Sequence, residues 1–398
     1  MAPVPVLISA GEASGDMYAA RLAVALRRRA DVDLFGMGGP RMREAGVDTV
    51  VDAADVGVLG VVEIVHKLPA LRRAWRRLIS EIDRRRPTIA ILTDFPAFHL
   101  RLSRVLRRKH VRNVYFVCPQ FWAWRPWRVR LVKRRFVRGL CIFPFEEDFY
   151  RKAGVRTDWI GHPLVDVVRA PVSRGAFAAR YGLDPKAPII AVLPGSRPTE
   201  LAHHMPQLMA AIAKMKAGGQ KQFVFATAPG LTQAQMKAHM GAQASEITTV
   251  EDATYELLAT ADVAIVSSGT ATVEAALIGV PMVVVYRVAP FTAWVVRHLA
   301  RTRLFAMVNV LADKEIVPEL IQDAFTPDNV VRETERLLGS ADAREEIDLE
   351  IGLRSAPRNW IQRNSDAFLC FRPLRPAEMQ GHSQNVGNCA VISRASLG

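Results

Sequence analysis

Short apolar runs alternate with longer amphipathic stretches along most of the chain, and this alternation constrains the fold more than any other feature. After the first apolar run, for example, residues 16–29 place Tyr18, Leu22 and Leu26 at helical spacing. Strands and helices that follow one another in this order predict parallel, doubly wound sheets, because a helix must carry the chain back before the next strand can pair. The apolar runs that predict strands lie at 4–9, 33–37, 88–93, 113–117, 139–143, 156–160, 189–193, 223–227, 247–250, 263–267 and 282–286.

The alternation is interrupted once, by a proline-containing connector at 170–188, and then restarts. We therefore predict an α/β protein with two Rossmann-like parallel-sheet domains, one at 1–169 and one at 170–355. The tail at 356–398 is rich in Gly, Ser, Asn and Pro and has no strong periodicity, so we expect it to be weakly ordered.

The chain carries a formal net charge of +14, and arginine clusters make its first 140 residues strongly basic. Such a surface attracts polyanions, including nucleic acid, anionic lipid and phosphorylated substrates. Solvated helix faces in a basic protein would give the same composition. Because the sequence has no helix-turn-helix, zinc-finger or RNA-recognition pattern, nucleic acid is not an expected partner.

The four cysteines are scattered and form no CxxC pair, which indicates a reducing compartment and predicts no structural metal. No run of about 18 apolar residues occurs, so no transmembrane helix is expected. The apolar start of the chain lacks a positively charged flank and is interpreted as a first strand rather than a signal peptide. We expect a cytoplasmic protein that is at most peripheral to a membrane.

Two polar segments follow predicted strands of the first half. Residues 10–16, AGEASGD, contain Glu12, Ser14 and Gly15 where a strand turns into a helix, a place that suits an anionic ligand. A tight turn with a capped helix is an equally good interpretation. Asp94 ends another strand, where it can act as a base or orient a hydroxyl, or simply begin a loop before a proline.

Two further segments in the second half suit a phosphorylated ligand. Gly195, Ser196 and Arg197 follow a strand, and an arginine there can make bidentate contacts with a diphosphate. The segment 267–274, SSGTATVE, begins a predicted helix whose N-terminus can bind phosphate. Its candidate donor-binding residues are Ser268, Gly269, Thr270 and Glu274, the last for ribose hydroxyls. The alternatives are a surface arginine in a turn and a capping box.

Three segments carry weaker signals. Trp122, Trp124 and Arg125 combine aromatic and basic side chains, which suits sugar stacking or a membrane interface, with core packing nearly as plausible. The apolar stretch 56–69 precedes an arginine-rich helix and fits acyl-chain binding or a buried amphipathic helix. His162 lies near the predicted domain junction and is a minor candidate for the cleft. An acidic pair at 31–33 enters an early strand and is not expected to bind a metal.

Together these segments resemble the lipid-A-disaccharide synthase family, in family order and over roughly residues 4–335. The matching stretches are AGEASGD (10–16), GMGGPRM (36–42), GVLGVVEIVHKLP (57–69), CPQFWAWRPWRV (118–129), FPFEEDFY (143–150), GHPLVD (161–166), LPGSRPTE (193–200), SSGTATVEAALIGVPMVVVYR (267–287) and VNVLADKEIVPELIQ (308–322).

The resemblance implies a GT-B fold, with the two domains facing a cleft, and an inverting, metal-independent hexosyltransferase without a cofactor. UDP-2,3-diacylglucosamine would be the donor, 2,3-diacylglucosamine 1-phosphate the acceptor, and a β-1,6 bond the product linkage. Arg197 matches the family's donor-phosphate arginine and Asp94 its essential aspartate. Glu12 and His162 are further catalytic candidates. Ser14, Gly15, Trp122, Trp124 and Arg125 are assigned to the acceptor, and an anionic membrane surface and a homodimer are partner hypotheses.

One departure concerns the segment that follows Asp94. The family commonly has Asp-x-Pro-Asp-Phe-Asn, where this chain has Asp94-Phe-Pro-Ala-Phe-His99. The first acid is kept and the second is Ala97. The C-terminal tail is a second departure, because it does not match the family. Together with Ala97 it keeps a catalytically silent nucleotide- or lipid-binding protein as an alternative. Another UDP-sugar GT-B enzyme, such as an epimerase or a peptidoglycan-type transferase, is a separate alternative.

Overall fold

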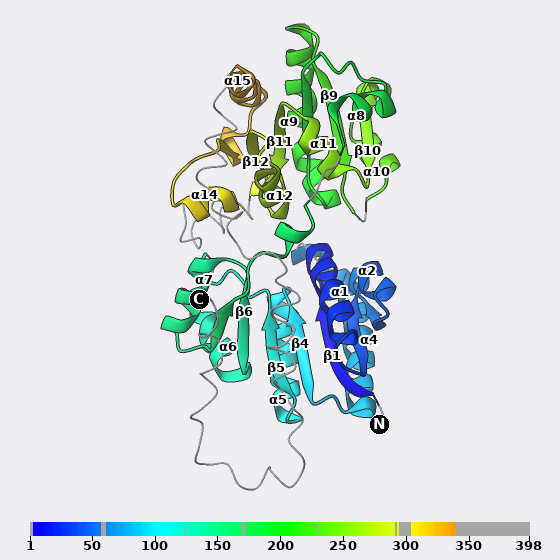
Figure 1. Ribbon diagram of the computed structural model, residues 1–398, viewed down its shortest axis with the longest axis vertical. Coiled ribbons are helices and arrows are strands. Elements are labelled where there is room, and N and C mark those ends of the chain that lie inside the picture. The colour runs from blue at the N-terminus through cyan, green and yellow to red at the C-terminus, as the bar shows by residue number, and fades with distance from the viewer. Residues whose placement is uncertain are drawn as a thin grey trace, which may run out of the picture.

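The computed structural model describes residues 3–56, 61–123, 125–168, 172–229, 231–290, 293 and 304–339, with the backbone alone at 61–68 and 242. The predicted stretch 56–69 therefore lies largely outside the described side chains, and Trp124 and the tail at 356–398 lie outside the described residues. Figure 1 shows two α/β units, one above the other along the long axis, with the chain crossing between them after β7.

The first unit contains a seven-stranded parallel sheet in the order β3-β2-β1-β4-β5-β6-β7. Its strands are β1 (Val4–Ala10), β2 (Val32–Gly38), β3 (Asp48–Asp52), β4 (Ile89–Thr93), β5 (Arg112–Phe116), β6 (Arg138–Cys141) and β7 (Thr157–Trp159). Its helices are α1 (Ala13–Arg27), α2 (Pro40–Glu44), α3 (Ala53–Val56), α4 (Val61–Arg85), α5 (Pro96–Arg108), η1 (Pro126–Arg128), α6 (Val129–Arg135), α7 (Pro144–Lys152) and η2 (Pro163–Asp166).

The second unit contains a six-stranded parallel sheet in the order β10-β9-β8-β11-β12-β13. Its strands are β8 (Ile189–Leu193), β9 (Gln222–Thr227), β10 (Thr248–Glu251), β11 (Val263–Ser267), β12 (Met282–Tyr286) and β13 (Glu319–Ile321). The described helices are α8 (Arg174–Tyr181), α9 (Pro198–Ala217), α10 (Gln233–Ala238), η3 (Gly241–Ser245), α11 (Thr254–Thr260), α12 (Thr270–Ile278), α14 (Met307–Ala312), η4 (Gln322–Ala324) and α15 (Pro327–Leu338). The two parallel sheets confirm the predicted fold class.

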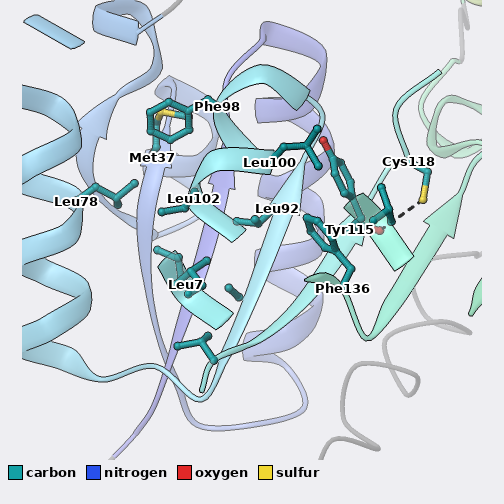
Figure 2. Packing of buried hydrophobic residues seen from close by; sticks show 14 of the residues in the cluster. Leu7, Met37, Leu78, Leu92, Phe98, Leu100, Leu102, Tyr115, Cys118 and Phe136 are labelled. Carbon is teal, nitrogen blue, oxygen red and sulfur yellow. Dashed lines mark hydrogen bonds between the residues drawn. The ribbon is translucent and has the colours of Figure 1, made fainter. Parts of the chain in front are cut away.

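Each sheet has apolar side chains on both faces, because helices cover both. Figure 2 shows part of the face of the first sheet under α4 and α5, where Leu7, Leu92 and Tyr115 from neighbouring strands meet Leu78 and Phe98 from these helices. Complete burial of a side chain such as Leu92 contributes about 1.5–3 kcal/mol. This packing holds the carboxyl ends of the strands, where the polar segments lie, in fixed positions.

The predicted strand pattern misses two of the four edge strands, β3 and β13. β3 buries only Val50 and Val51, and β13 has three residues of which Leu320 alone is buried. So few buried side chains do not give a clear apolar run. The acidic pair at 31–33 enters β2, and Asp33 forms an ion pair with Arg85.

Candidate functional site

The carboxyl ends of β1 and β4 bring Asp94 against the turn that follows β1. The two strands pair so that Ala10 lies beside Thr93, and Gly11 N donates to Asp94 Oδ1 at 3.3 Å. A Cβ at Gly15 would lie only 1.8 Å from Asp94 Oδ2, so the carboxylate lies directly against the first turn of α1. Oδ2 is buried and has no hydrogen bond of good geometry among the described residues, although the nearby main chain of Gly15 helps to lower the pKa of Asp94, which burial raises.

Burial raises the pKa of Asp94 well above its ordinary value, and the nearby carboxylate of Glu12 raises it further. The N–H of Gly11 opposes this shift, whereas Asp16 adds to it. A carboxyl group whose pKa is raised is a stronger base once it has lost its proton. The site therefore holds a carboxyl group whose burial makes it a stronger base than an exposed aspartate.

Asp16 does not cap its own helix. Its carboxylate accepts from the N–H groups of Gly39 at 2.6 Å, Arg41 at 3.0 Å and Met42 at 3.2 Å, so it caps α2 instead. The first residue before α1, Glu12, makes no side-chain cap either. The predicted alternative of a capped α1 is therefore not what the structure shows, and the helix N-terminus keeps its favourable potential for an anion.

The segment after β8 reaches across to the first unit. Gly195 has a φ of +132°, which suits a residue without a side chain, and Ser196 N donates to Glu200 Oε2 at 2.9 Å. Arg197 Nη1 contacts Glu200 Oε1 at 3.3 Å, and its Nη2 contacts Glu12 Oε2 at 3.2 Å. Arg197 of the second unit therefore contacts Glu12 of the first, whose carboxylate also acts on Asp94.

His204 in α9 forms hydrogen bonds with the main chain of this segment. Its Nδ1 lies 2.7 Å from Pro194 O, and Arg287 N donates to its Nε2 at 2.9 Å. Burial lowers the pKa of His204, which keeps the ring neutral, with Nδ1 protonated and Nε2 accepting. The ring therefore fixes the main chain immediately before Gly195.

The N-terminus of α12 lies at the carboxyl end of β11 in the second unit. Gly269 precedes the helix with a φ of +149°, and nothing lies within 4 Å of where its Cβ would be. Ser268 Oγ donates to Phe305 O at 3.1 Å, which leaves its lone pairs available, and Thr270 begins the helix. No side chain caps α12, so the capping-box alternative is not observed. The open, uncapped end can receive a phosphate group.

Glu274 lies one turn further along α12, partly buried at the boundary between the two units. Tyr255 Oη donates to Glu274 Oε1 at 3.0 Å, and burial raises the pKa of this glutamate. Burial raises the pKa of Tyr18 in α1, and the charge of Glu274 raises it further. Glu274 therefore lies close to the first unit. Its second oxygen remains able to accept from another donor.

The residues assigned to the acceptor lie in two separate segments of the first unit. Ser14 and Gly15 form the first turn of α1 beside Asp94. Trp122 is half-buried, donates from Nε1 to Glu146 Oε1 at 3.1 Å and packs edge-on against Phe145.

Arg125 precedes η1 with a φ of +52°. The neighbouring Trp127 is 58% exposed, and the guanidinium of Arg128 lies 5.6 Å from its ring. Exposed aromatic and basic side chains therefore lie together in this segment.

His162 is buried between Tyr18 and Phe143, at ring centroid distances of 6.1 Å and 5.2 Å. Its Nδ1 accepts from Leu164 N at 3.2 Å and so caps η2. Burial lowers its pKa to about 3. Among the described residues no hydrogen bond joins His162 to Asp94 or Arg197, and its catalytic role stays a prediction.

His99 and Tyr115 both contact the main chain of Asp94, and neither was predicted as a site residue. The only signal in the sequence is that His99 follows Asp94 closely in a segment that begins a helix. Tyr115 resembles an ordinary core residue of a strand. Among the described residues no group of three or more His, Cys, Asp or Glu side chains could hold a metal ion, and none of the described helices is long and apolar enough to cross a membrane.

Comparison with known proteins agrees with this geometry. The family model for lipid-A-disaccharide synthetase matches residues 6–368. The lipid-A-disaccharide synthase of Koribacter versatilis is 44% identical over 346 residues, covering 86% of this chain and 90% of the relative. That of Myxococcus xanthus is 40% identical over 347 residues, covering 87% and 91%.

Solved structures with the same fold are more distant in sequence. A putative UDP-N-acetylglucosamine 2-epimerase from Listeria monocytogenes has a TM-score of 0.62 at 12% identity, covering 93% of this chain and 95% of that chain. The calicheamicin glycosyltransferase CalG4 has a TM-score of 0.58 at 16% identity, covering 93% and 98%. These two neighbours establish the GT-B fold. With the family model and the relatives, they show that the chain belongs to the lipid-A-disaccharide synthase family of glycosyltransferases.

Proposed function

We propose that this protein transfers 2,3-diacylglucosamine from UDP to 2,3-diacylglucosamine 1-phosphate, forms a β-1,6 bond and releases UDP. The observation that carries the proposal is the arrangement where the two units meet. A buried carboxyl group, Asp94, lies on one side, and Arg197 with the uncapped N-terminus of α12 lies on the other. The first can take a proton and the second can bind a diphosphate.

The reaction needs both features at once. The 6-hydroxyl of the acceptor attacks the anomeric carbon of the donor from the face opposite UDP, which inverts the configuration. Asp94 takes the hydroxyl proton as the new C–O bond forms. The bond from the anomeric carbon to the phosphate oxygen breaks, and its electron pair leaves on UDP. Arg197 and the N–H groups at the start of α12 offset the charge that develops there.

The neighbouring residues then have supporting roles. Gly195 and Ser196 let the main chain approach the diphosphate, Ser268, Gly269 and Thr270 receive phosphate oxygens, and Glu274 accepts from a ribose hydroxyl. Ser14, Gly15, Trp122, Trp124 and Arg125 contact the acceptor. Glu12 and His162 are weaker candidates for the base, since Glu12 is already engaged by Arg197.

A turnover assay tests the proposal. Purified protein is mixed with UDP-2,3-diacylglucosamine and 2,3-diacylglucosamine 1-phosphate in mixed micelles with EDTA, and UDP and disaccharide are counted. Equal amounts of both products are expected. UDP without disaccharide would favour an epimerase-like or hydrolytic reaction, and UDP binding without any turnover would favour a silent binding protein.

Asp94→Asn tests the base. The variant should lose turnover but still bind UDP, because the amide cannot take the proton while the diphosphate site is unchanged. If turnover stays within about tenfold of the unmodified enzyme, or about 1.4 kcal/mol of barrier, Asp94 is not the base.

The proposal includes work at the inner face of the cytoplasmic membrane. Burial lowers the pKa of Arg128 and of Arg135, and the positive charges of neighbouring arginines in α5, in α6 and before η1 lower both further, which indicates a concentrated positive potential. The arginines involved are Arg101, Arg104, Arg107, Arg125, Arg128, Arg134 and Arg135. Binding to vesicles should require anionic lipid and weaken with salt. Equal binding to neutral vesicles would contradict the electrostatic contribution.

A further inference from the structure

Asp94 and Phe95 have an unusual main-chain conformation. Their φ angles are +48° and +43°, so two consecutive residues with side chains occupy the left-handed region. This region is unfavourable for a residue that carries a Cβ, and it persists only where the surroundings impose it. The turn directs the chain from the end of β4 into α5, which begins at Pro96. Contacts from surrounding residues must therefore hold this left-handed turn in place.

The carbonyl oxygen of Asp94 is held by two buried side chains. His99 Nδ1 lies 2.8 Å from this oxygen, and Tyr115 Oη donates to it at 2.9 Å. A carbonyl can only accept, so His99 carries its proton on Nδ1, and the neutral ring accepts at Nε2 from Ser9 Oγ at 2.8 Å. Ser9, His99 and Tyr115 are each 0% exposed. His99 from α5 and Tyr115 from β5 contact the carbonyl oxygen directly, and Ser9 from β1 holds the His99 ring.

The same turn sets the direction of the Asp94 side chain. The carboxylate lies between Gly11, whose N–H it accepts, and Gly15, where any Cβ would overlap it. Phe95 occupies the space that a side chain at Gly11 would need, and it stacks on Phe98 at a centroid distance of 5.8 Å. A rotation of the Asp94 main chain would therefore swing the carboxylate out of this space.

We propose that His99 and Tyr115 are positioning residues, which hold the main chain of Asp94 through its carbonyl oxygen and so keep its carboxylate in the orientation that catalysis needs. This inference rests on the proposed function, in which Asp94 is the base. Neither residue touches the substrate. Each acts through the left-handed turn, and loss of either hydrogen bond lets the turn relax toward an ordinary conformation.

A relaxed turn would change the pKa of the base as well as its position. Burial is the main cause of the raised pKa of Asp94, so a carboxylate that moves toward water should titrate at lower pH. The titratable groups around Asp94 are Glu12 before α1, Asp16 and Tyr18 in α1, Tyr115 in β5 and His99 in α5. Burial lowers the pKa of His99 to about 4, so its ring stays neutral in the range where Asp94 works.

Tyr115→Phe tests the inference with a minimal change. The variant keeps the ring, which packs 4.7 Å from Phe136 (Figure 2), and removes only the hydroxyl. We expect kcat to fall about tenfold with KM nearly unchanged, and the acidic limb of the pH profile to move to lower pH. Tyr150→Phe is the matched control, since it removes a buried hydroxyl that donates to the carbonyl of Pro119 in the same sheet unit. It should lower thermal stability by a similar amount and leave kcat and the pH profile unchanged.

Substitutions at His99 give a second comparison that does not depend on Tyr115. His99→Leu removes the donor to Asp94 O, and its kcat should fall as for Tyr115→Phe. His99→Asn places an amide nitrogen close to the position of Nδ1, and it should restore most of the lost kcat. Equal kcat values for His99→Leu and His99→Asn would overturn the positioning role of His99.

Combination with Asp94→Asn separates this inference from the proposed function. If Tyr115 acts through Asp94, Tyr115→Phe should not reduce the residual rate of Asp94→Asn any further. A further tenfold loss in the double variant would show a role independent of Asp94. An unmodified enzyme without turnover would refute the proposed function, whereas an active enzyme that keeps its kcat and pH profile in Tyr115→Phe would refute this inference alone.

Discussion

Gly15→Ala should inactivate the enzyme through steric displacement of Asp94 and not through unfolding. The new methyl carbon would lie 1.8 Å from Asp94 Oδ2 and 2.6 Å from Cγ. Non-bonded heavy atoms rest roughly 3.5 Å apart, so the carboxylate must move by more than about 1 Å. A displacement of about 1 Å at a reacting group costs about 100-fold in rate. This loss corresponds to about 2.7 kcal/mol of barrier.

The effect on stability should be small, because two contributions oppose each other. Alanine in a helix is favoured over glycine by about 1 kcal/mol. Overpacking costs about 1–3 kcal/mol. We therefore expect Gly15→Ala to keep its melting temperature within a few degrees of the parent and to bind UDP normally.

The assay combines kcat from UDP release, the Kd for UDP from calorimetry and the melting temperature. Gly175→Ala is the matched control, because Gly175 also lies in a helix, α8, and nothing is found within 4 Å of where its Cβ would be. This control should keep kcat unchanged and gain slightly in stability. A folded Gly15→Ala enzyme with the parent kcat would refute the argument that Asp94 needs this space.

Three other predictions concern the donor site and the Trp122 segment. Arg197→Ala should weaken UDP binding about 10- to 100-fold, as expected for the loss of charge-assisted hydrogen bonds, and unchanged affinity would remove Arg197 from the donor site. Glu12→Gln should tighten UDP binding by up to about fivefold, because the diphosphate no longer competes with a half-exposed ion pair, and weaker binding would contradict this. Burial raises the pKa of Glu146 from 4.5 to about 7. The folded state therefore holds its proton more tightly, so the free energy of unfolding should fall by up to about 3 kcal/mol as pH rises from 4.5 to 7. Denaturant unfolding should show this decline in the parent and a flatter profile in Glu146→Gln, and equal slopes would contradict the assignment.

The sequence predicted the two parallel sheets because their central strands are continuous apolar runs buried on both faces. The edge strands β3 and β13 gave no such signal, since each buries only one or two side chains. Boundaries of the central strands differ from the predicted ones by a residue or two, which is usual where hydrogen bonding rather than hydrophobicity ends a strand.

The site was only partly predictable, for a different reason. Asp94 and Arg197 follow buried strands, so their place at the cleft could be deduced from the chain order. The contact of Arg197 with Glu12 joins residues far apart in the sequence and depends on how the two units meet. The bonds of His99 and Tyr115 go to a main-chain oxygen, whose direction depends on left-handed φ angles that the residue types Asp and Phe do not indicate.

Val273 of α12 is almost fully buried in the hydrophobic cluster of the first unit, and Leu277 from the same helix packs against that cluster. The helix that we propose binds the diphosphate is thus also a core element of the unit that carries the proposed base. Separation of the two units would expose Val273 to water at a cost of about 1.5–3 kcal/mol from this side chain alone. The closed arrangement should therefore already dominate before any ligand arrives, and almost none of the donor's binding energy is needed to select it. For this enzyme, affinity for UDP should report the contacts themselves and not the population of a rare closed state.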